Sequence, residues 1–235
     1  MAPLGLRPLT MPLRPLTDLD AADWFVSDAA TSSAAPSLRT QVGPPGFDAY
    51  VRVLHSTTGD GERFEGHLDA ALLAALVDVL RAYTATPDDC FFALWEGYGD
   101  IHGGEAAGFL TAFSGPPKWP GRIFTKEKPV APPPPAFPPH VMEGPLLSAN
   151  DETYFLFGGP LAEAGRWGAQ GYGNGAPRDI NSPNLMWPAD HAWFVTTGIE
   201  GTWTGVGGSE SLVAALLRDD RLETVRQRYD DGALR

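Results

Sequence analysis

The spacing of apolar side chains predicts a long amphipathic helix in the first half of the chain. Between residues 68 and 83 the apolar positions recur every three or four residues, as in a helix with one buried face. These positions are Leu68, Leu72, Leu76, Val79 and Tyr83, flanked by Leu73 and Leu80. Burial of each leucine contributes about 1.5–3 kcal/mol, so we expect this helix to anchor the core. The helix should end before Thr86, because a residue that precedes proline is biased away from the α region.

Shorter apolar runs predict the strands. Residues 47–55 suit a pleated surface, and residues 90–100 are almost entirely apolar. A run of the second kind is covered on both faces, so we expect it to be central in its sheet. Residues 153–160 form another apolar strand. Residues 192–200 and 201–206 indicate two adjacent strands joined by a tight turn at Glu200 and Gly201.

The C-terminal pattern predicts two more helices. Residues 209–220 place Leu212, Val213, Leu216 and Leu217 inward, and residues 221–229 place Leu222, Val225 and Tyr229 on one face. The order of elements shows no regular β-α-β repeat. We therefore expect an α+β fold: a single domain with a mostly antiparallel mixed sheet packed by two main helices, and a Pro-rich surface insertion.

Proline-rich segments suggest the domain boundaries. Residues 1–16 contain the pentapeptide LRPLT twice and are predicted to be a flexible leader, in which Met11 offers an alternative start. The single α+β domain would then span 17–235. A basic and proline-dense stretch at about 116–139 is predicted to be an insertion in polyproline II conformation on the surface.

Charge and cysteine content narrow the class of protein. The 235 residues carry a net charge of −12, which repels nucleic acids and anionic membranes. The single cysteine, Cys90, excludes an internal disulfide and a multi-cysteine zinc site. No window approaches the roughly 18 apolar residues of a membrane span, and prolines interrupt the N-terminus, unlike a signal peptide. We expect a cytoplasmic protein without a cofactor.

The stretch GVGGS, residues 205–209, raises the question of a phosphate loop. Its glycines precede a predicted helix, but no lysine or arginine lies between Arg178 and Arg218. Glu210 would occupy the positive end of the helix dipole, where a phosphate would have to bind. We interpret the glycines as a corner that supplies positive φ angles, with Ser209 as the helix N-cap.

Two other stretches contain groups able to do acid–base or metal chemistry. Glu96 and His102 follow a buried strand and could act as an acid–base pair, and His102 with Glu105 could bind a metal. The alternative is that these side chains are simply solvated, and no HExxH motif is present. Asp190 next to His191 suggests a triad, but no GxSxG nucleophile motif accompanies the pair. We therefore predict no metal site and no catalytic residue.

Aromatic residues near glycine-rich turns offer a different kind of site. They are Trp95, Tyr98, Trp167, Tyr172, Trp187, Trp193 and Trp203. Such residues line apolar pockets and interfaces, although strand alternation indicates that some of them belong to the core.

Three blocks of the sequence together resemble a family of proteins. The blocks are GFDAYVRVLH, TATPDDCFFALWEGYG and SPNLMWPADHAWFVTTGIEGTWTGVGGSESLVAALLRDDRLE. They are similar to an uncharacterised actinobacterial family that combines AYxRxLH, TPDxCxFxxWEGxG and WPxDxAWxVxTEI…TxVGG motifs. The resemblance covers roughly residues 45–105 and 180–225, and this chain differs at Gly198, where the family pattern implies an acidic residue. No activity is established for the family, so the resemblance implies one domain and no reaction.

These observations favour a non-catalytic binding or interaction domain, whose partner is an unknown protein or small molecule. The residues expected to line its site are Trp95, Glu96, Tyr98, His102, Trp187, Asp190 and Trp203. The alternative is a metal-assisted or acid–base hydrolase or lyase that uses Glu96 and His102.

Overall fold

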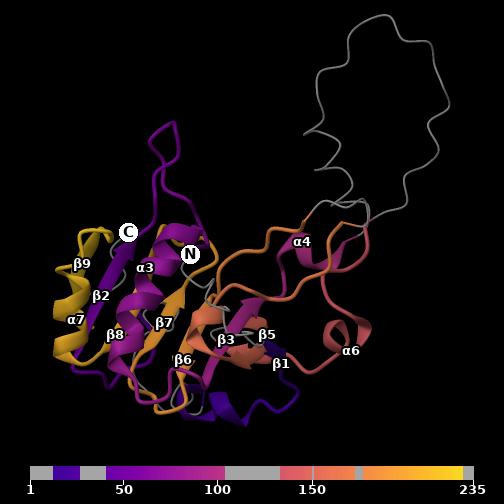
Figure 1. Cartoon of the computed structure of the whole chain (residues 1–235), viewed down its shortest axis with the longest axis horizontal. Helices are drawn as coiled ribbons and strands as arrows, with labels where there is room; N and C mark the ends of the chain where they lie inside the picture. Colours follow the sequence, from indigo (N-terminus) through magenta and orange to yellow (C-terminus); the bar gives the residue numbers. More distant parts are fainter. Residues whose placement is uncertain (1–12, 27–40, 104–132, 150, 173–176, 230–235) are drawn as a thin grey trace, which may run out of the picture. The chain divides into compact units, whose positions relative to one another are not determined.

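The computed structural model describes residues 13–26, 41–103, 133–149, 151–172 and 177–229 (Figure 1). Where the sequence predicts one domain over 17–235, the contacts divide the chain into two compact units. Unit 1 comprises Met1–Glu96, Pro145–Trp167 and Asn181–Arg235, and unit 2 comprises Gly97–Gly144 and Gly168–Ile180. Most of the predicted Pro-rich insertion, and residues 1–12 of the predicted leader, lie outside the described residues.

Unit 1 contains a nine-stranded sheet in which every described pairing is antiparallel. The strand order is β1-β5-β3-β6-β7-β8-β2-β9, and β4 pairs with β5. The strands are β1 Arg14–Pro15, β2 Ala49–Leu54, β3 Cys90–Trp95, β4 Leu147–Ala149, β5 Glu152–Gly159, β6 Leu185–Pro188, β7 Phe194–Thr197, β8 Trp203–Gly208 and β9 Thr224–Gln227. The antiparallel sheet combined with helices confirms the α+β class.

The longest helix of unit 1 is α3, Ala70–Leu80, which continues as a 3-10 turn, η2, Arg81–Tyr83. It lies within the range predicted from the leucine spacing. The Asp69 side chain accepts hydrogen bonds from the backbone N–H groups of Ala71 and Leu72 and so caps the helix. Leu73, Leu76 and Leu80 are buried, whereas Leu72 and Val79 are only half-buried. The buried face is therefore rotated slightly from the predicted one.

The second helix, α7, Glu210–Leu216, follows β8 directly. Ser209 is its N-cap, as predicted, and accepts a hydrogen bond from Leu212 N–H at 3.2 Å. The helix contacts α3, β2 and β8 (Figure 1). Unit 1 also contains two further 3-10 turns: η1, Asp20–Ala22, which runs into helical residues 23–26, and η3, Leu161–Glu163.

The prediction of a central strand at 90–100 is confirmed for its first half. β3 pairs with β5 on one side and β6 on the other. It ends at Trp95, opposite Tyr154 near the start of β5, and Glu96 N–H donates one more hydrogen bond to Thr153 O at 3.0 Å. Glycines at 97 and 99 then follow, and the chain enters unit 2.

The prediction of a helix at 221–229 is wrong. Thr224–Gln227 form the edge strand β9, which pairs with β2, and Val225 lies opposite Arg52 with 40% of its surface exposed. The apolar residues at 222, 225 and 229 fit a helical period, but the open edge of β2 offers backbone hydrogen bonds that a short exposed helix would lack. The prediction failed because the sequence of residues 221–229 contains no information about the free edge of β2 with which they pair.

The predicted leader also ends earlier than residue 16. Arg14 and Pro15 form β1 on the edge of β5, and Leu13 is buried. Gly158 and Gly159 of β5 make room for this segment, because a Cβ atom at either position would meet the side chain of Leu16 at 3.1 Å or of Leu13 at 3.0 Å.

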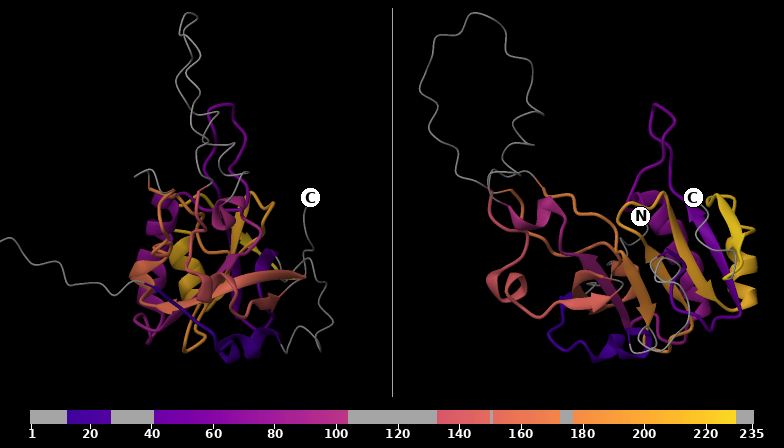
Figure 2. Two further views of the ribbon diagram at one scale, coloured as in Figure 1. Left: turned by 90° about the vertical axis from the view of Figure 1, so that its right-hand side faces the viewer. Right: turned by 180° about the vertical axis from the view of Figure 1, so that it is seen from behind.

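The glycines of GVGGS lie within β8 and not at a corner, and none of them has a positive φ. Their role is close packing on both faces of the sheet. A Cβ atom at Gly208 would meet Leu212 of α7 at 2.6 Å, whereas at Gly207 it would meet Phe47 at 2.6 Å. At Gly205 it would collide with the backbone oxygen of Gln41. The chain at 41–47 therefore crosses the sheet face opposite α7, directly on the glycines of β8 (Figure 2).

The face that carries segment 41–47 has its own hydrophobic cluster. Ala22 and Phe25 near the N-terminus pack there against Trp187 and Phe194 of the sheet. Trp187 and Phe194 stack with ring centroids 5.8 Å apart. On the opposite face, Val51, Phe92 and Val206 are fully buried. Both faces of the sheet are thus covered, which explains the near-continuous apolar sequence of β3.

The described residues of unit 2 include two short helices: α4, Gly99–His102, and α6, Pro139–Met142. Arg178 joins these segments, because its guanidinium donates to the backbone oxygens of Asp100 (2.6 Å) and Pro134 (2.5 Å). The same group lies over the ring of Tyr172, whose hydroxyl donates to the Asp100 carboxylate at 2.8 Å. Among the described helices of the two units, none has the length and apolar character to cross a bilayer.

Candidate binding site

A pocket of about 300 Å³ lies beside Trp203 at the end of the sheet where β8 begins. Its volume is at the lower end of the usual range for small-molecule sites. The lining residues are Gln41, Gly198, Ile199, Glu200, Gly201 and Trp203. All of them belong to unit 1, and four come from the turn between β7 and β8.

Hydrogen bonds hold that turn in place. Gly201 N–H donates to Gly198 O at 2.9 Å within the turn. Gly66 N–H donates to Gly201 O at 2.8 Å, and His55 N–H to Thr202 O at 3.0 Å. A Cβ atom at Gly66 would collide with the backbone oxygen of Ile199, so only glycine permits this approach. The pocket wall made by the turn is therefore rigidly supported from outside the pocket.

Gln41 reaches the pocket because the chain at 41–47 crosses β8. Tyr50 O–H donates to Pro44 O at 2.9 Å, and Tyr229 O–H donates to Gly43 O at 3.2 Å, which ties the crossing segment to β2 and to the chain after β9. The Gln41 side-chain oxygen is buried and has no hydrogen-bond partner. A buried amide oxygen without a partner costs free energy, and several other buried polar atoms of the described residues share this feature, among them Trp193 Nε1.

Arg52 on β2 is not a lining residue, but it brings a positive charge to Trp203, which is one. Its guanidinium carbon lies 5.2 Å from the centre of the Trp203 ring, a cation–π contact. Cross-strand pairing places Arg52 opposite Gly205, the glycine on which Gln41 rests. Arg52 Nε is buried without a hydrogen-bond partner, and none of the ion pairs between described residues includes Arg52.

A buried polar chain runs across the same end of the sheet on the opposite face. His55 Nδ1 lies 2.8 Å from Phe64 O, which can only accept, so Nδ1 carries the proton. Nε2 then accepts from the hydroxyl of Thr204 at 2.9 Å, and Thr204 accepts from Thr197 at 2.8 Å. Burial lowers the pKa of His55, although the Phe64 carbonyl acts in the other direction.

This chain of hydrogen bonds is structural and not catalytic. His55 is fully buried, so its imidazole cannot touch a substrate, as a general base must. Asn184 continues the chain, because its backbone oxygen accepts from Thr197 N–H at 2.7 Å and its side-chain oxygen from Trp95 N–H at 2.9 Å. The strands that carry the pocket are thereby joined to β3.

Trp203 is the one predicted site residue that lines this pocket. Trp95 lies at the same end of the sheet, but β6 and β7 separate β3 from β8. Three strand spacings correspond to roughly 14 Å, too far for both tryptophans to contact one small molecule. Trp95 Nε1 donates to the Glu152 carboxylate at 2.7 Å, and Glu96 accepts from the Thr153 hydroxyl at 3.1 Å.

Tyr98 and His102 belong to unit 2, whereas Glu96 belongs to unit 1. His102 is exposed and Tyr98 is half-buried. Glu105, the other proposed metal ligand, lies outside the described residues. In the part of the chain that the structure describes, no group of three or more His, Cys, Asp or Glu side chains is placed to hold a metal ion.

Two predicted binding residues have structural roles instead. Trp187 is fully buried, and its indole N–H donates to Ala21 O at 3.1 Å, so it cannot line a surface site. Asp190 accepts hydrogen bonds from the Thr84 hydroxyl (2.9 Å) and from the N–H groups of Ala85 (2.6 Å) and Ala192 (3.1 Å). Desolvation favours a higher pKa for this carboxyl, but these hydrogen bonds outweigh it and lower the pKa.

Sequence reasoning missed Arg52, Gln41 and the His55 chain. Arg52 stands in the alternating strand AYVRVL, where a charged side chain between apolar neighbours is an ordinary feature of a half-exposed strand. Arg52 becomes a candidate binding residue only because Trp203 and Gln41, which are distant from it in the sequence, lie close to it in the fold. Comparisons with models of protein families, with curated proteins and with solved structures find no match to this chain.

Proposed function

We propose that this chain is a non-catalytic cytoplasmic domain that binds a small molecule in the pocket beside Trp203. The observation that supports the proposal is the composition of that pocket: a half-buried tryptophan, a supported turn, and the polar residues Gln41 and Glu200. An aromatic wall with a few polar groups is the usual composition of a small-molecule site. No arrangement of described residues favours the alternative of a hydrolase or lyase through Glu96 and His102.

The proposal extends to parts of the chain that carry no site. We propose that α3 and α7 are the main helices covering the sheet, and that the segment at about 116–139 is a Pro-rich surface insertion. The contact of α7 with α3, β2 and β8 supports the first statement, and the density of proline supports the second. Membership of the actinobacterial family with AYxRxLH and WPxDxAW motifs stays a proposal on the residues quoted above.

A ligand screen on the wild-type chain tests the binding function. A library of small metabolites is screened by saturation-transfer NMR, and each hit is measured by thermal shift, because a ligand specific for the folded state raises its melting temperature. Every genuine hit should lose affinity in Gly198→Phe, which fills the pocket. Gly198 has space for a side chain, since the nearest atom to a Cβ there is 3.8 Å away.

Two further variants complete this test. Trp203→Ala removes the aromatic wall and should abolish binding, whereas Phe64→Ala, at an exposed aromatic residue outside the pocket lining, should leave binding unchanged. A screen with no hit on the wild type, or hits that survive both pocket variants, would refute a binding function at this site.

A further inference from the structure

The charge on Arg52 identifies the class of ligand, if the proposed function is correct. Three arginines in the described residues are half-buried: Arg52, Arg63 and Arg178. Arg63 forms an ion pair with Glu223 at 2.8 Å, and Arg178 donates to two backbone oxygens. The side chain of Arg52 has no hydrogen bond and no ion pair with any described residue; its partner is the Trp203 ring.

An uncompensated guanidinium is unexpected in this chain. There are 29 acidic residues and 17 basic ones, so carboxylates are abundant. The exposed Arg221 and Arg226 each pair with a carboxylate at 2.8–2.9 Å, although pairs so exposed stabilise proteins little. A half-buried cation has more to gain from a counter-charge, because partial desolvation strengthens the attraction. The described residues thus leave this guanidinium without a counter-charge, which the carboxylate of a ligand can supply.

We propose that the pocket beside Trp203 binds a small molecule through a carboxylate group, which Arg52 pairs with while the apolar part of the molecule packs on Trp203. The planar guanidinium matches a carboxylate in two parallel hydrogen bonds. The contact with the tryptophan ring holds the guanidinium in one orientation before the ligand arrives, which lowers the entropic cost of binding. The side-chain amide of Gln41 supplies a further donor at the pocket wall.

The surroundings favour one carboxylate over a phosphate group. The pocket lining contains no arginine or lysine, Arg52 reaches it through its contact with Trp203, and Glu200 in the lining carries the opposite charge. A dianionic phosphate group is usually held by several cations or by the N-terminus of a helix. No described helix begins at the residues that line the pocket. A single monovalent group therefore complements the single guanidinium.

Phenylacetate is a suitable probe, because it combines one carboxylate with one aromatic ring. Its affinity for the full-length chain is measured by ligand-observed NMR titration, beside phenylacetamide, which has the same shape without the charge, and inorganic phosphate. We expect phenylacetate to bind at least about tenfold more tightly than phenylacetamide, since charge-assisted hydrogen bonds are the stronger kind. Phosphate should not displace it at equal concentration.

Two pairs of matched variants locate the charge. Arg52→Met should lower the affinity for phenylacetate by about tenfold or more, whereas Arg226→Met, which changes the net charge equally but removes an exposed pair with Glu210, should not. Gly198→Glu places a carboxylate in the pocket and should weaken binding, while the neutral Gly198→Gln should retain most of it. Thermal melts verify that each variant folds.

The outcomes separate this inference from the proposed function. Any one of three results would overturn the carboxylate assignment. They are equal affinities for phenylacetamide and phenylacetate, equal affinities of the two arginine variants for phenylacetate, and displacement of phenylacetate by phosphate. Hits that are neutral or cationic, and that Gly198→Phe abolishes, would overturn it while leaving a binding pocket in place. An absence of any hit in the screen removes both proposals together.

Discussion

His55 Nε2 accepts a hydrogen bond from the hydroxyl of Thr204, 2.9 Å away, in the interior between β2 and β8. A second proton on this fully buried imidazole would place a positive charge away from water, which burial disfavours. Folding therefore favours the neutral form of His55, in agreement with its lowered pKa.

His55 should make the stability of the protein depend on pH. In the unfolded chain its pKa is near 6.5, the ordinary value for histidine, and in the folded chain it is lower. Between these values the unfolded state binds a proton that the folded state does not, so stability is fully present above about pH 6.5 and is lost as the pH falls. His55→Gln should flatten the rise in melting temperature between about pH 5 and 7.

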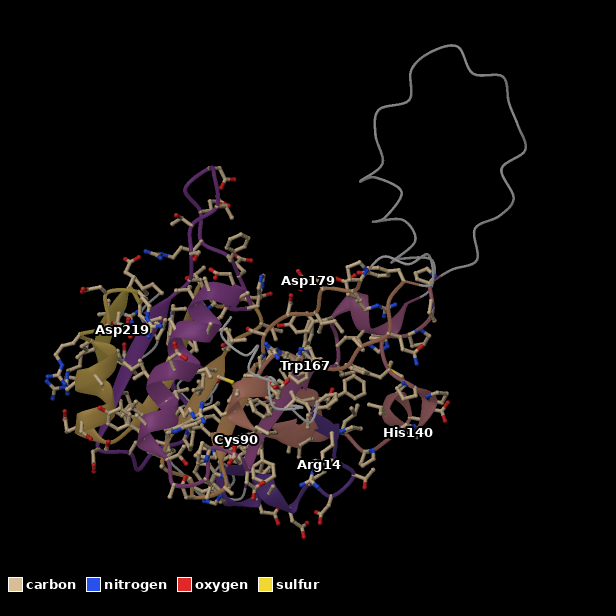
Figure 3. All side chains as sticks on the ribbon, viewed as in Figure 1. Arg14, Cys90, His140, Trp167, Asp179 and Asp219 are labelled. Atoms are coloured by element: carbon tan, nitrogen blue, oxygen red, sulfur yellow. The ribbon has the colours of Figure 1, made fainter. Side chains whose placement is uncertain are left out.

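The same variant should also lower stability at pH 8 by about 1–3 kcal/mol, because glutamine cannot satisfy both partners as well as imidazole does. His140→Gln, at an exposed histidine of unit 2 (Figure 3), is the control and should retain the wild-type pH profile. An unchanged profile in His55→Gln would show that His55 does not titrate on unfolding.

Asp190 should stabilise the junction between the chain after α3 and the turn after β6. Its carboxylate receives three donors, from Thr84, Ala85 and Ala192, and an amide at this position accepts with only one oxygen. We expect Asp190→Asn to lower the free energy of unfolding by about 1–2 kcal/mol, a modest value because the residue is exposed.

Urea denaturation measures this difference, with Asp220→Asn as the control. Asp220 is exposed, and the described residues include no hydrogen-bond partner for its side chain. Equal unfolding free energies for the two variants would contradict a stabilising role for Asp190.

Gly205→Ala should destabilise unit 1 by about 1–3 kcal/mol, the usual cost of forcing extra atoms into a packed site. The added Cβ would collide with Gln41 O and would lie 2.9 Å from Val42 Cα, both of which are backbone atoms. Gly59→Ala, where a Cβ meets nothing within 4 Å, should change stability by less than about 0.5 kcal/mol. Chemical denaturation of both variants decides whether segment 41–47 rests on β8.

Cys90 should be inert in the folded protein. It is fully buried in β3 (Figure 3), and burial, assisted by the negative charge of Asp89, raises the pKa of the thiol to about 12. Because the thiolate is the reactive form, labelling with a maleimide at pH 7.5 should be much slower in buffer than in denaturant. Rapid labelling without denaturant would indicate local opening of the centre of the sheet.

The sequence was sufficient for elements whose signals are local. Three elements are specified in this way: α3 by its leucine spacing, α7 by its serine cap and β3 by its apolar run. Each of these signals is contained in a few neighbouring residues of the element itself. β9 was mistaken for a helix because its identity depends on the free edge of β2, about 170 residues earlier in the chain.

The candidate site was harder to predict for the same reason. Trp203 could be identified as a candidate from its place beside a glycine-rich turn. Gln41 could not, because its position depends on Gly205 being too small to exclude it. The sequence around the glycines of β8 predicts a corner, because it contains no sign of the segment 41–47 that crosses over them.

The position of β2 has a consequence for synthesis of the protein. β2 pairs only with β8 and β9 in the described sheet, and His55 and Thr204 are 149 residues apart. At the usual rate of translation, roughly 7–30 s pass between the synthesis of these two residues. During that interval Val51 and Val53 have neither strand partner, and both are fully buried in the finished sheet. The nascent chain therefore emerges with an unpaired apolar strand, the kind of surface that promotes aggregation until its partner strands are made.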